Sequence, residues 1–358
     1  MRLGYHTGYW SAGPPPGAAE AVVAAERLGF DSVWTAEAYG SDALTPLAWW
    51  GSRTSRIRLG TAVAQIAART PTAAAMAALT LDHLSGGRFT LGLGASGPQV
   101  VEGWYGQPYP RPLARTREYL AVVRDVLRRE APVTSAGEFY PLPYPGGTGL
   151  GKPLRSTVHP LRADLPIHLA AQGPRNTALT AEIADGWLPL FYSPRLDATA
   201  RELLAEGFAR RSPGLAPPEE FEVTATVPVV LDDDVERAAD AVRPFIALYA
   251  GGMGAPGANF HRDALERLGY GDVCNDIQAH YVAGRRAQAA AAVPLELVQD
   301  VALVGPPDAV RAQLAAWRAS AVTTLLVQTD PRALPQVAAV LGDGDPASGA
   351  AGAGAAAP

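Results

Sequence analysis

Short runs of apolar residues alternate along the chain with longer stretches whose apolar positions repeat at helical spacing. Each apolar run is short enough for one buried strand, and Gly, Pro or polar residues bound it. No hairpin signal separates neighbouring runs, which favours parallel strands joined by helical crossovers. We predict about eight strands, at Arg2–Thr7, Ser32–Ala36, Ile57–Ala64, Arg88–Ala95, Pro166–Ala171, Gly186–Phe191, Glu222–Leu231 and Thr323–Gln328.

The stretches between these runs carry helix signals. Residues 18–28 place Val22 and Ala25 on one apolar face and Glu20 and Arg27 on the other. Proline, which is tolerated in the first helical turn, opens several of the other stretches. Further helices are predicted at 46–53, 71–84, 112–128, 175–184 and 308–318.

Parallel strands with helical crossovers form either an open doubly wound sheet or a closed barrel. The first strand begins at residue 2, and no GxGxxG motif opens a helix after it. This favours an α/β fold of the (β/α)8 TIM-barrel type, with the open sheet as the alternative. We expect one barrel domain over residues 1–341, because barrels of this kind often exceed 250 residues as a single domain.

Two insertions interrupt the alternation, at about 131–165 and 251–300. Irregular segments of this length are usually lids or binding loops. We therefore expect both to shape a substrate pocket at the C-terminal face of the barrel, with Asn259 and His261 as candidate lid residues. Residues 342–358 contain almost nothing that could be buried and are predicted to be a disordered tail.

Composition restricts the class of partner. The formal net charge is -5, without a basic stripe, which argues against nucleic acid. A lone cysteine, Cys274, cannot form an intrachain disulfide, and we see neither a signal peptide nor a membrane span. We expect a cytoplasmic protein that acts on a small molecule. The six histidines form no HxxxH or His/Cys cluster, so we predict no metal site.

The ends of the predicted strands supply candidate chemistry. In a TIM barrel the ligand lies over these ends, and here they are mostly small and apolar, as a flat ring requires. His6, Glu37 and Tyr39 are the polar candidates for catalysis. At Gln172–Asn176 a strand turns into a helix whose free amides can hold an anion, although a plain β-to-α turn would carry the same pattern.

Several motifs resemble the luciferase-like monooxygenase superfamily, and its coenzyme F420-dependent branch in particular. They are found in order along nearly the whole chain. The quoted segments are AERLGFDSVW (25–34), IRLGTAV (57–63), SGGRFTLGLG (85–94), AAQGPRNTALTAEIADGWLP (170–189) and LVGPPDAVRAQLAAW (303–317).

This resemblance implies a luciferase-like TIM barrel and a cofactor, F420 or alternatively FMN. It implies a non-prolyl cis peptide bond between Ala62 and Val63, behind the cofactor ring. It places the cofactor phosphate on the turn at Gly173–Asn176. The cofactor-binding residues implied are Thr61, Ala62, Val63, Gln65, Gly94, Ala95, Ser96, Gln172, Gly173, Pro174, Arg175 and Asn176.

The chain departs from the F420-dependent sugar-phosphate dehydrogenases of this superfamily. Those enzymes carry an acidic-His pair where this chain has Glu37 and Ala38, and a glutamate where it has Gly97. A sugar phosphate is therefore a poor substrate candidate. The proton donor cannot be transferred from the family, so Glu37, His6, Tyr39 and Glu102 are candidates by position alone.

Hydride transfer between deazaflavin C5 and a small organic substrate is the favoured function. The substrate would carry an activated C=C, C=N or C=O bond, or be an alcohol. Two alternatives remain: an FMN-dependent monooxygenase, and a barrel that binds a ligand without catalysis. We also expect a homodimer, because dimers are common among such barrels.

Overall fold

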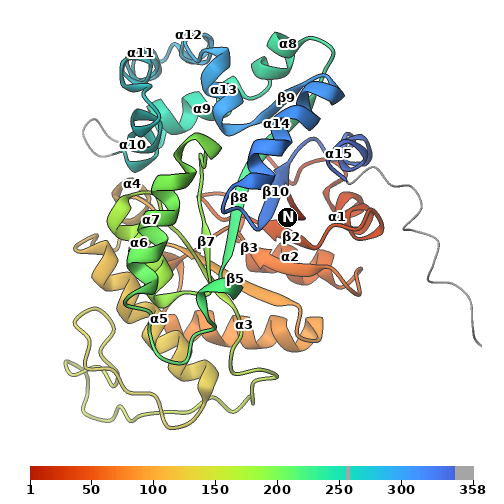
Figure 1. Cartoon of the computed structure of the whole chain (residues 1–358). Coiled ribbons are helices and arrows are strands. Elements are labelled where there is room, and N and C mark those ends of the chain that lie inside the picture. Colours follow the sequence, from red (N-terminus) through yellow and green to blue (C-terminus); the bar gives the residue numbers. More distant parts are fainter. Residues whose placement is uncertain (255–258, 343–358) are drawn as a thin grey trace, which may run out of the picture.

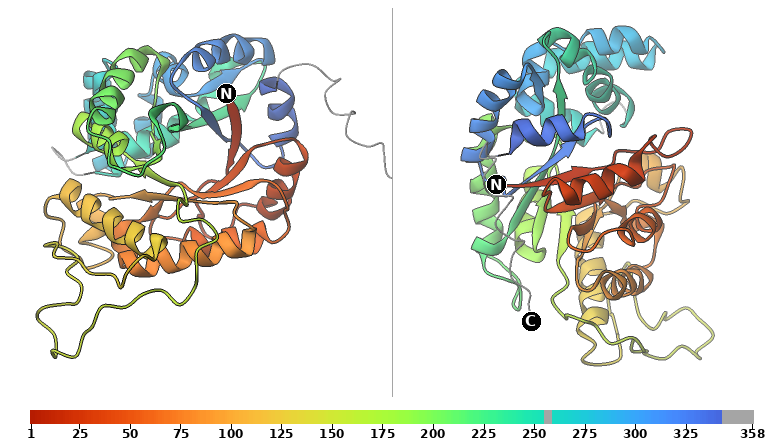
Figure 2. Two further views of the ribbon diagram at one scale, coloured as in Figure 1. Left: turned by 60° about the horizontal axis from the view of Figure 1, so that its bottom comes forward. Right: turned by 90° about the vertical axis from the view of Figure 1, so that its right-hand side faces the viewer.

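The computed structural model describes residues 1–254 and 259–342, and its centre is a closed barrel of eight parallel strands (Figures 1 and 2). Closure is shown by the last strand, which pairs with both its neighbours in the ring, β1 and β8. The predicted barrel and its eight strand positions are confirmed. The barrel strands are β1 (Arg2–His6), β2 (Ser32–Thr35), β3 (Arg58–Thr61), β5 (Phe89–Gly94), β6 (Ile167–Ala170), β7 (Gly186–Leu188), β8 (Glu222–Leu231) and β10 (Thr324–Gln328).

Two short strands were not predicted. The strand β4 (Ala64–Gln65) continues β3 after a break at residues 62–63 and pairs with β5. The strand β9 (Leu303–Gly305) pairs with the far end of β8, beyond the barrel. The chain enters β9 from the second insertion, so this strand belongs to the insertion rather than to the ring.

Helices cover the outside of the barrel, one crossover after another (Figure 1). The predicted helices are found within a few residues of their expected bounds, and α7 is one that the periodicity did not reveal. The helices that cover the barrel are α1 (Ala18–Arg27), α2 (Leu44–Gly51), α3 (Pro71–Ser85), α5 (Pro112–Arg128), α6 (Pro174–Ile183), α7 (Asp197–Phe208), α14 (Pro307–Ala319) and α15 (Leu334–Leu341).

The helix α3 shows how local sequence sets these bounds. The Thr70 hydroxyl accepts a hydrogen bond from the backbone N–H of Ala73, and Pro71 occupies the first turn. Gly86 ends the helix with φ of 65°, in the left-handed region that favours glycine. The SGGR turn that marked the sequence is therefore a helix stop leading into β5.

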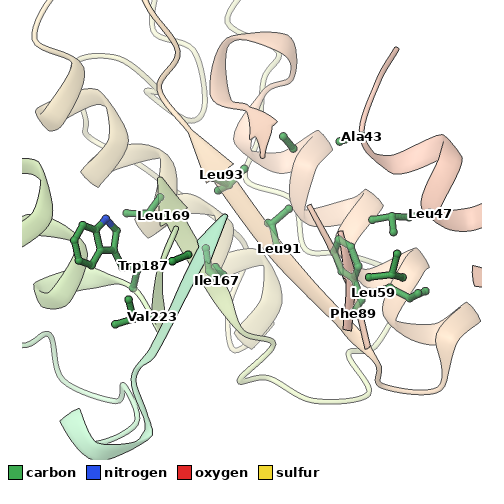
Figure 3. Packing of buried hydrophobic residues seen from close by; sticks show 14 of the residues in the cluster. Ala43, Leu47, Leu59, Phe89, Leu91, Leu93, Ile167, Leu169, Trp187 and Val223 are labelled. Atoms are coloured by element: carbon green, nitrogen blue, oxygen red, sulfur yellow. The ribbon is translucent and has the colours of Figure 1, made fainter. Parts of the chain in front are cut away.

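The main core lies between the strands and the surrounding helices. Alternate side chains of each strand point outward, since successive residues of a strand face opposite sides. Figure 3 shows Leu91 and Leu93 of β5 beside Ile167 and Leu169 of β6, all almost fully buried. This shell of apolar contacts holds the barrel at a fixed diameter.

The interior of the barrel is filled mainly by one large side chain, Trp34 of β2. Most inward positions around it are small, and the Trp34 ring stacks on His168 with 5.6 Å between centroids. Gly60 of β3 leaves room for it, because a Cβ at that position would lie 2.3 Å from Trp34 Cε3. Below the ring, Arg58 pairs with Glu222 and Asp31 at the N-terminal end of the barrel.

The expectation that residues 131–165 form an active-site lid is wrong. They join the end of α5 to the start of β6, so both ends of the segment lie at the N-terminal face, opposite the expected pocket. The segment is extended and runs along the outside of the helices (Figure 2). It is anchored there by Arg162 on Asp82 of α3 and by Phe139 N–H on Glu118 of α5. Proline-rich composition indicated irregular backbone correctly, but not the face on which it lies.

The second insertion is helical rather than irregular. It packs around its own apolar cluster, and Asn259 caps its helix α10 by accepting hydrogen bonds from the N–H groups of His261 and Arg262. Residues 255–258 and the predicted tail from 343 onward lie outside the described residues. In the structure this insertion begins earlier than predicted, directly after β8, and its helical elements are α8 (Val235–Asp240), α9 (Arg243–Ala247), η4 (Leu248–Gly252), α10 (Phe260–Arg267), α11 (Gly271–Val282), α12 (Arg286–Ala291) and α13 (Leu295–Val301).

In residues 1–254 and 259–342, no helix combines the length and apolarity needed to cross a bilayer. The same residues contain no group of three or more His, Cys, Asp or Glu side chains placed to hold a metal ion. The expected cytoplasmic location and homodimer stay predictions.

Gly60→Ala should destabilise the barrel, because the added methyl group overlaps the Trp34 ring and the closed barrel cannot widen locally. Overpacking of a filled core costs about 1–3 kcal/mol. Chemical denaturation of Gly60→Ala should show a loss in this range. Gly13→Ala, where a Cβ meets no atom within 4 Å, is the matched control.

The double variant Gly60→Ala with Trp34→Phe should lose less stability than the sum of the two single variants, since the smaller ring makes room for the methyl group. Strict additivity of the two losses would show that these residues do not compete for the same space.

Candidate active site

A cavity of about 320 Å³ opens at the C-terminal mouth of the barrel, above Trp34. All three predicted catalytic side chains, His6, Glu37 and Tyr39, line it. Of the predicted cofactor residues, Thr61, Pro174 and Arg175 do not line it. Those that do are Ala62, Val63, Gln65, Gly94, Ala95, Ser96, Gln172, Gly173 and Asn176.

The floor of the cavity, formed by Ala62 and Val63, is apolar. The peptide bond between Ala62 and Val63 is cis, as predicted, and it lies at the break between β3 and β4. Beneath the floor Trp34, Leu188 and Leu326 form a buried cluster against which Ala62 and Val63 pack. The floor needs a glycine at position 94, because a Cβ there would lie 2.6 Å from Val63 Cγ2.

Thr61 holds this floor from outside the cavity. Its hydroxyl donates to Gly92 O at 2.7 Å and accepts from Gly92 N–H at 2.8 Å. The side chain is fully buried. Its place in the structure is therefore to join β3 to β5 beneath the floor.

The imidazole of His6 uses both of its nitrogens within the protein. Its Nδ1 accepts from Gly8 N–H at 3.0 Å, which leaves the proton on Nε2, 3.4 Å from Ala62 O. Burial lowers the pKa of His6 to about 4, so the ring is neutral at pH 7. His6 is held against the floor as a neutral side chain.

Glu37 is bound in an ion pair beside the floor. Arg69 donates to both carboxylate oxygens, at 2.8 and 2.9 Å, and Gln65 N–H donates to Oε2 at 2.7 Å. The Glu37 side chain is only 4% exposed. These three donors occupy both carboxylate oxygens, so the side chain is engaged by the protein rather than directed at a substrate. This geometry argues against Glu37 as the catalytic acid.

At one end of the cavity the helix α6 begins. Gly173 is its N-cap residue and has no neighbour within 4 Å of a Cβ position, so the space over the helix end is open. The first amides of a helix have no intrahelical acceptor, and the helix dipole makes this end positive. Arg175 stands in this first turn, exposed to solvent rather than lining the cavity.

A second cation near this helix end was missed by the sequence reasoning. Arg267, at the end of α10, donates to Gln172 O at 2.9 Å and is exposed. The two residues are far apart in the chain, and no motif links them. The predicted anion site therefore has a guanidinium from the second insertion beside it.

Another wall of the cavity is aromatic and comes partly from the second insertion. Phe260 and His261 line the cavity, while Asn259 caps α10 and donates to Tyr249 O and Ala250 O. Tyr9 and Tyr249, which the sequence reasoning missed, also line it. Tyr9 follows the first strand closely and could have been found from the strand end; Tyr249 could not, because its helix is not part of the barrel.

Comparisons with known proteins agree with this architecture. The family described as luciferase-like monooxygenase matches residues 3–324. A protein of Mycobacterium tuberculosis with the provisional name coenzyme F420-dependent oxidoreductase Rv3520c is 59% identical over 330 residues, which are 91% of this chain and 94% of the relative.

Two solved structures share the fold. The coenzyme F420-dependent tetrahydromethanopterin reductase of Methanopyrus kandleri superposes with a TM-score of 0.78 at 23% identity, over 94% of this chain and 97% of its own. An F420-dependent secondary alcohol dehydrogenase in complex with an F420–acetone adduct superposes with a TM-score of 0.75 at 17% sequence identity. The superposition covers 96% of this chain and 99% of the dehydrogenase chain. The chain belongs to the luciferase-like monooxygenase family, in the branch that includes proteins named as F420-dependent oxidoreductases.

Proposed function

We propose that the chain is a coenzyme F420-dependent oxidoreductase that transfers hydride between the deazaflavin ring and a small organic substrate. One observation carries the proposal: a single cavity joins an apolar floor at Ala62–Val63 to the N-terminus of α6. A flat ring with an anionic tail matches both features at once. The relative that is 59% identical and bears an F420-dependent name supports F420 over FMN.

The residues present fit such a cofactor. Gly94 keeps the floor free of a side chain, and Gly173 keeps the helix end open. Arg175 and Arg267 can meet negative groups beyond the phosphate, which F420 carries in its lactyl-glutamate tail. We infer that the ring lies on the Ala62–Val63 floor and that the tail leaves past α6.

When bound, F420 supplies or accepts hydride at C5. The protein supplies position and a water-poor environment. The floor supports one face of the ring, and the aromatic wall of Tyr249, Phe260 and His261 limits the space left for a substrate over the other face. The substrate we propose carries an activated C=C, C=N or C=O bond, or is an alcohol.

Fluorescence titration of the purified protein should show F420 binding, with FMN at least about tenfold weaker, a difference of about 1.4 kcal/mol. The physical reason is the extra carboxylates of F420 near the two guanidinium groups. Tight FMN binding without F420 binding would favour the monooxygenase alternative. Absence of both would favour a binding protein of another kind.

Arg267→Gln should weaken F420 binding about two- to fivefold at low salt, the range expected for one partly exposed charge pair. The difference should largely vanish at high ionic strength, because exposed charges are screened. The matched control is Arg128→Gln, which removes an exposed arginine at the end of α5, on the opposite face. Equal F420 affinities of the two variants would show that Arg267 does not contribute to the anion site.

Glu37→Gln tests whether Glu37 positions the floor or takes part in the chemistry. The change leaves Arg69 facing an amide group, and we expect a loss of about 3–5 kcal/mol in unfolding free energy together with weaker F420 binding. Glu138→Gln breaks an exposed pair with Arg111 and should change neither value. If stability and F420 affinity were unchanged while turnover was lost, Glu37 would be catalytic.

A further inference from the structure

Two tyrosine hydroxyls meet on the aromatic wall of the cavity. Tyr249, in η4, is 3% exposed, and its hydroxyl donates to the hydroxyl oxygen of Tyr9 at 3.0 Å. The described residues give the Tyr9 O–H no acceptor of its own. A hydroxyl that already accepts a hydrogen bond is a stronger donor, because chains of hydrogen bonds polarise one another.

Both hydroxyls keep their protons at neutral pH. Burial raises the pKa of Tyr249 well above its ordinary value and also raises that of Tyr9. The hydrogen bond from Tyr249 acts on Tyr9 in the opposite direction, since it stabilises the Tyr9 phenolate. Tyr9 is thus a protonated hydrogen-bond donor, and its phenolate would accept a hydrogen bond from the hydroxyl of Tyr249.

Other ionisable groups of the cavity are less suited to give a proton. Glu37 is held by Arg69, and both nitrogens of His6 are hydrogen-bonded. Burial lowers the pKa of His261 to about 3, so its ring is neutral at pH 7. Tyr39 is 55% exposed at the rim. Tyr109 also lines the cavity, but its hydroxyl already donates to Ser96 O. Tyr9 combines a proton without an acceptor among the described residues with a hydroxyl partner that donates to it.

The residues that line the cavity also restrict the charge of the substrate. Among the described lining residues there is no lysine or arginine, and the carboxylate present, Glu37, is already paired. A charged substrate group placed against this wall would lose its hydration without gaining a counter-charge, which is costly. A carbonyl oxygen needs only a hydrogen-bond donor, and Tyr9 offers one.

We infer that Tyr9, polarised by the hydroxyl of Tyr249, is the acid that protonates the oxygen of an uncharged aldehyde or ketone in this cavity. The inference rests on the proposed function, which supplies the hydride from reduced F420. In that reduction the C5–H bond of reduced F420 would break and its hydride would form a new C–H bond at the carbonyl carbon, leaving oxidised F420. The C=O π pair would move to oxygen, and the Tyr9 O–H bond would break as that oxygen takes the proton. The product is an alcohol, and the proton that water returns to Tyr9 balances the one that the oxidised cofactor would release to water.

A chromophoric aldehyde tests the hydrogen bond without any cofactor. The visible absorption of uncharged 4-(dimethylamino)cinnamaldehyde moves to the red when its carbonyl oxygen accepts a strong hydrogen bond. Bound to the full-length wild-type chain, the aldehyde should absorb to the red of the same aldehyde bound to Tyr9→Phe. The shift should be lost in Tyr9→Phe and kept in Tyr144→Phe, which removes an exposed hydroxyl from residues 131–165.

Tyr249→Phe separates positioning from direct contact. The aldehyde should still bind, with a red shift between those of the wild type and Tyr9→Phe, because Tyr9 remains but is no longer polarised. A shift in Tyr249→Phe equal to the wild-type value would remove Tyr249 from the proposal. Melting temperatures of all variants establish that each is folded.

Turnover completes the test with F420-loaded protein. For methyl 4-acetylbenzoate, Tyr9→Phe should lower kcat about 100-fold or more, the usual contribution of a general acid. Its F420 affinity should stay within about twofold, since no cofactor contact is removed. The charged analogue 4-acetylbenzoate should bind at least about tenfold more weakly than the ester.

The inference is overturned if Tyr9→Phe keeps the full red shift and wild-type kcat, or if the shift is lost in Tyr39→Phe instead. Failure of F420 to bind the wild type would overturn the proposed function separately, and the aldehyde measurement on the cofactor-free chain would still decide the role of Tyr9.

Discussion

The structure depends on how the interior of the barrel is filled. Close packing is required there, yet most inward positions are Gly, Ala, Ser or Thr, so the single ring of Trp34 takes up much of the volume. It fits because Gly60 has no side chain. The height of this ring sets the depth of the cavity above it, and the cis peptide at Ala62–Val63 lies directly over the cluster that Trp34 forms with Leu188 and Leu326. The packing of the barrel interior therefore determines the position of the cavity floor at Ala62–Val63.

The fold could be predicted largely from sequence because its strongest signals are local. Apolar runs of strand length, prolines at helix starts and the SGGR turn each act within a few residues, and together they fix eight strands and most of the helices. The floor and the turn at Gln172–Asn176 followed from resemblance in the same way. Local signals could not indicate at which face of the barrel an irregular segment lies. Residues 131–165 were correctly irregular, but both ends lie at the N-terminal face, because an α-to-β connection returns the chain there, and no residue of the segment lines the cavity.

The parts of the site that sequence reasoning missed are those made by long-range contacts. Arg267 reaches Gln172 from the second insertion, and Tyr249 reaches Tyr9 across 240 positions in the chain. A long-range contact also changes the role expected for Glu37. Its place at a strand end indicated chemistry, but the bidentate contact with Arg69 depends on where the next loop folds. Strand-end position locates a pocket; the partners of each side chain decide what the side chain can do there.

These partners divide the cavity into two electrostatic halves. Near α6, the helix end and the nearby Arg175 and Arg267 favour negative charge. Elsewhere in the cavity Glu37 is paired with Arg69, and His6 and His261 are neutral, so hydroxyl and aromatic groups remain. A ligand spanning both halves must be anionic at one end and uncharged at the other. This asymmetry would orient a cofactor before any substrate enters, with its charged tail toward α6 and its ring toward Tyr9. It also lets substrates be selected by charge, because the half that remains open favours a neutral guest.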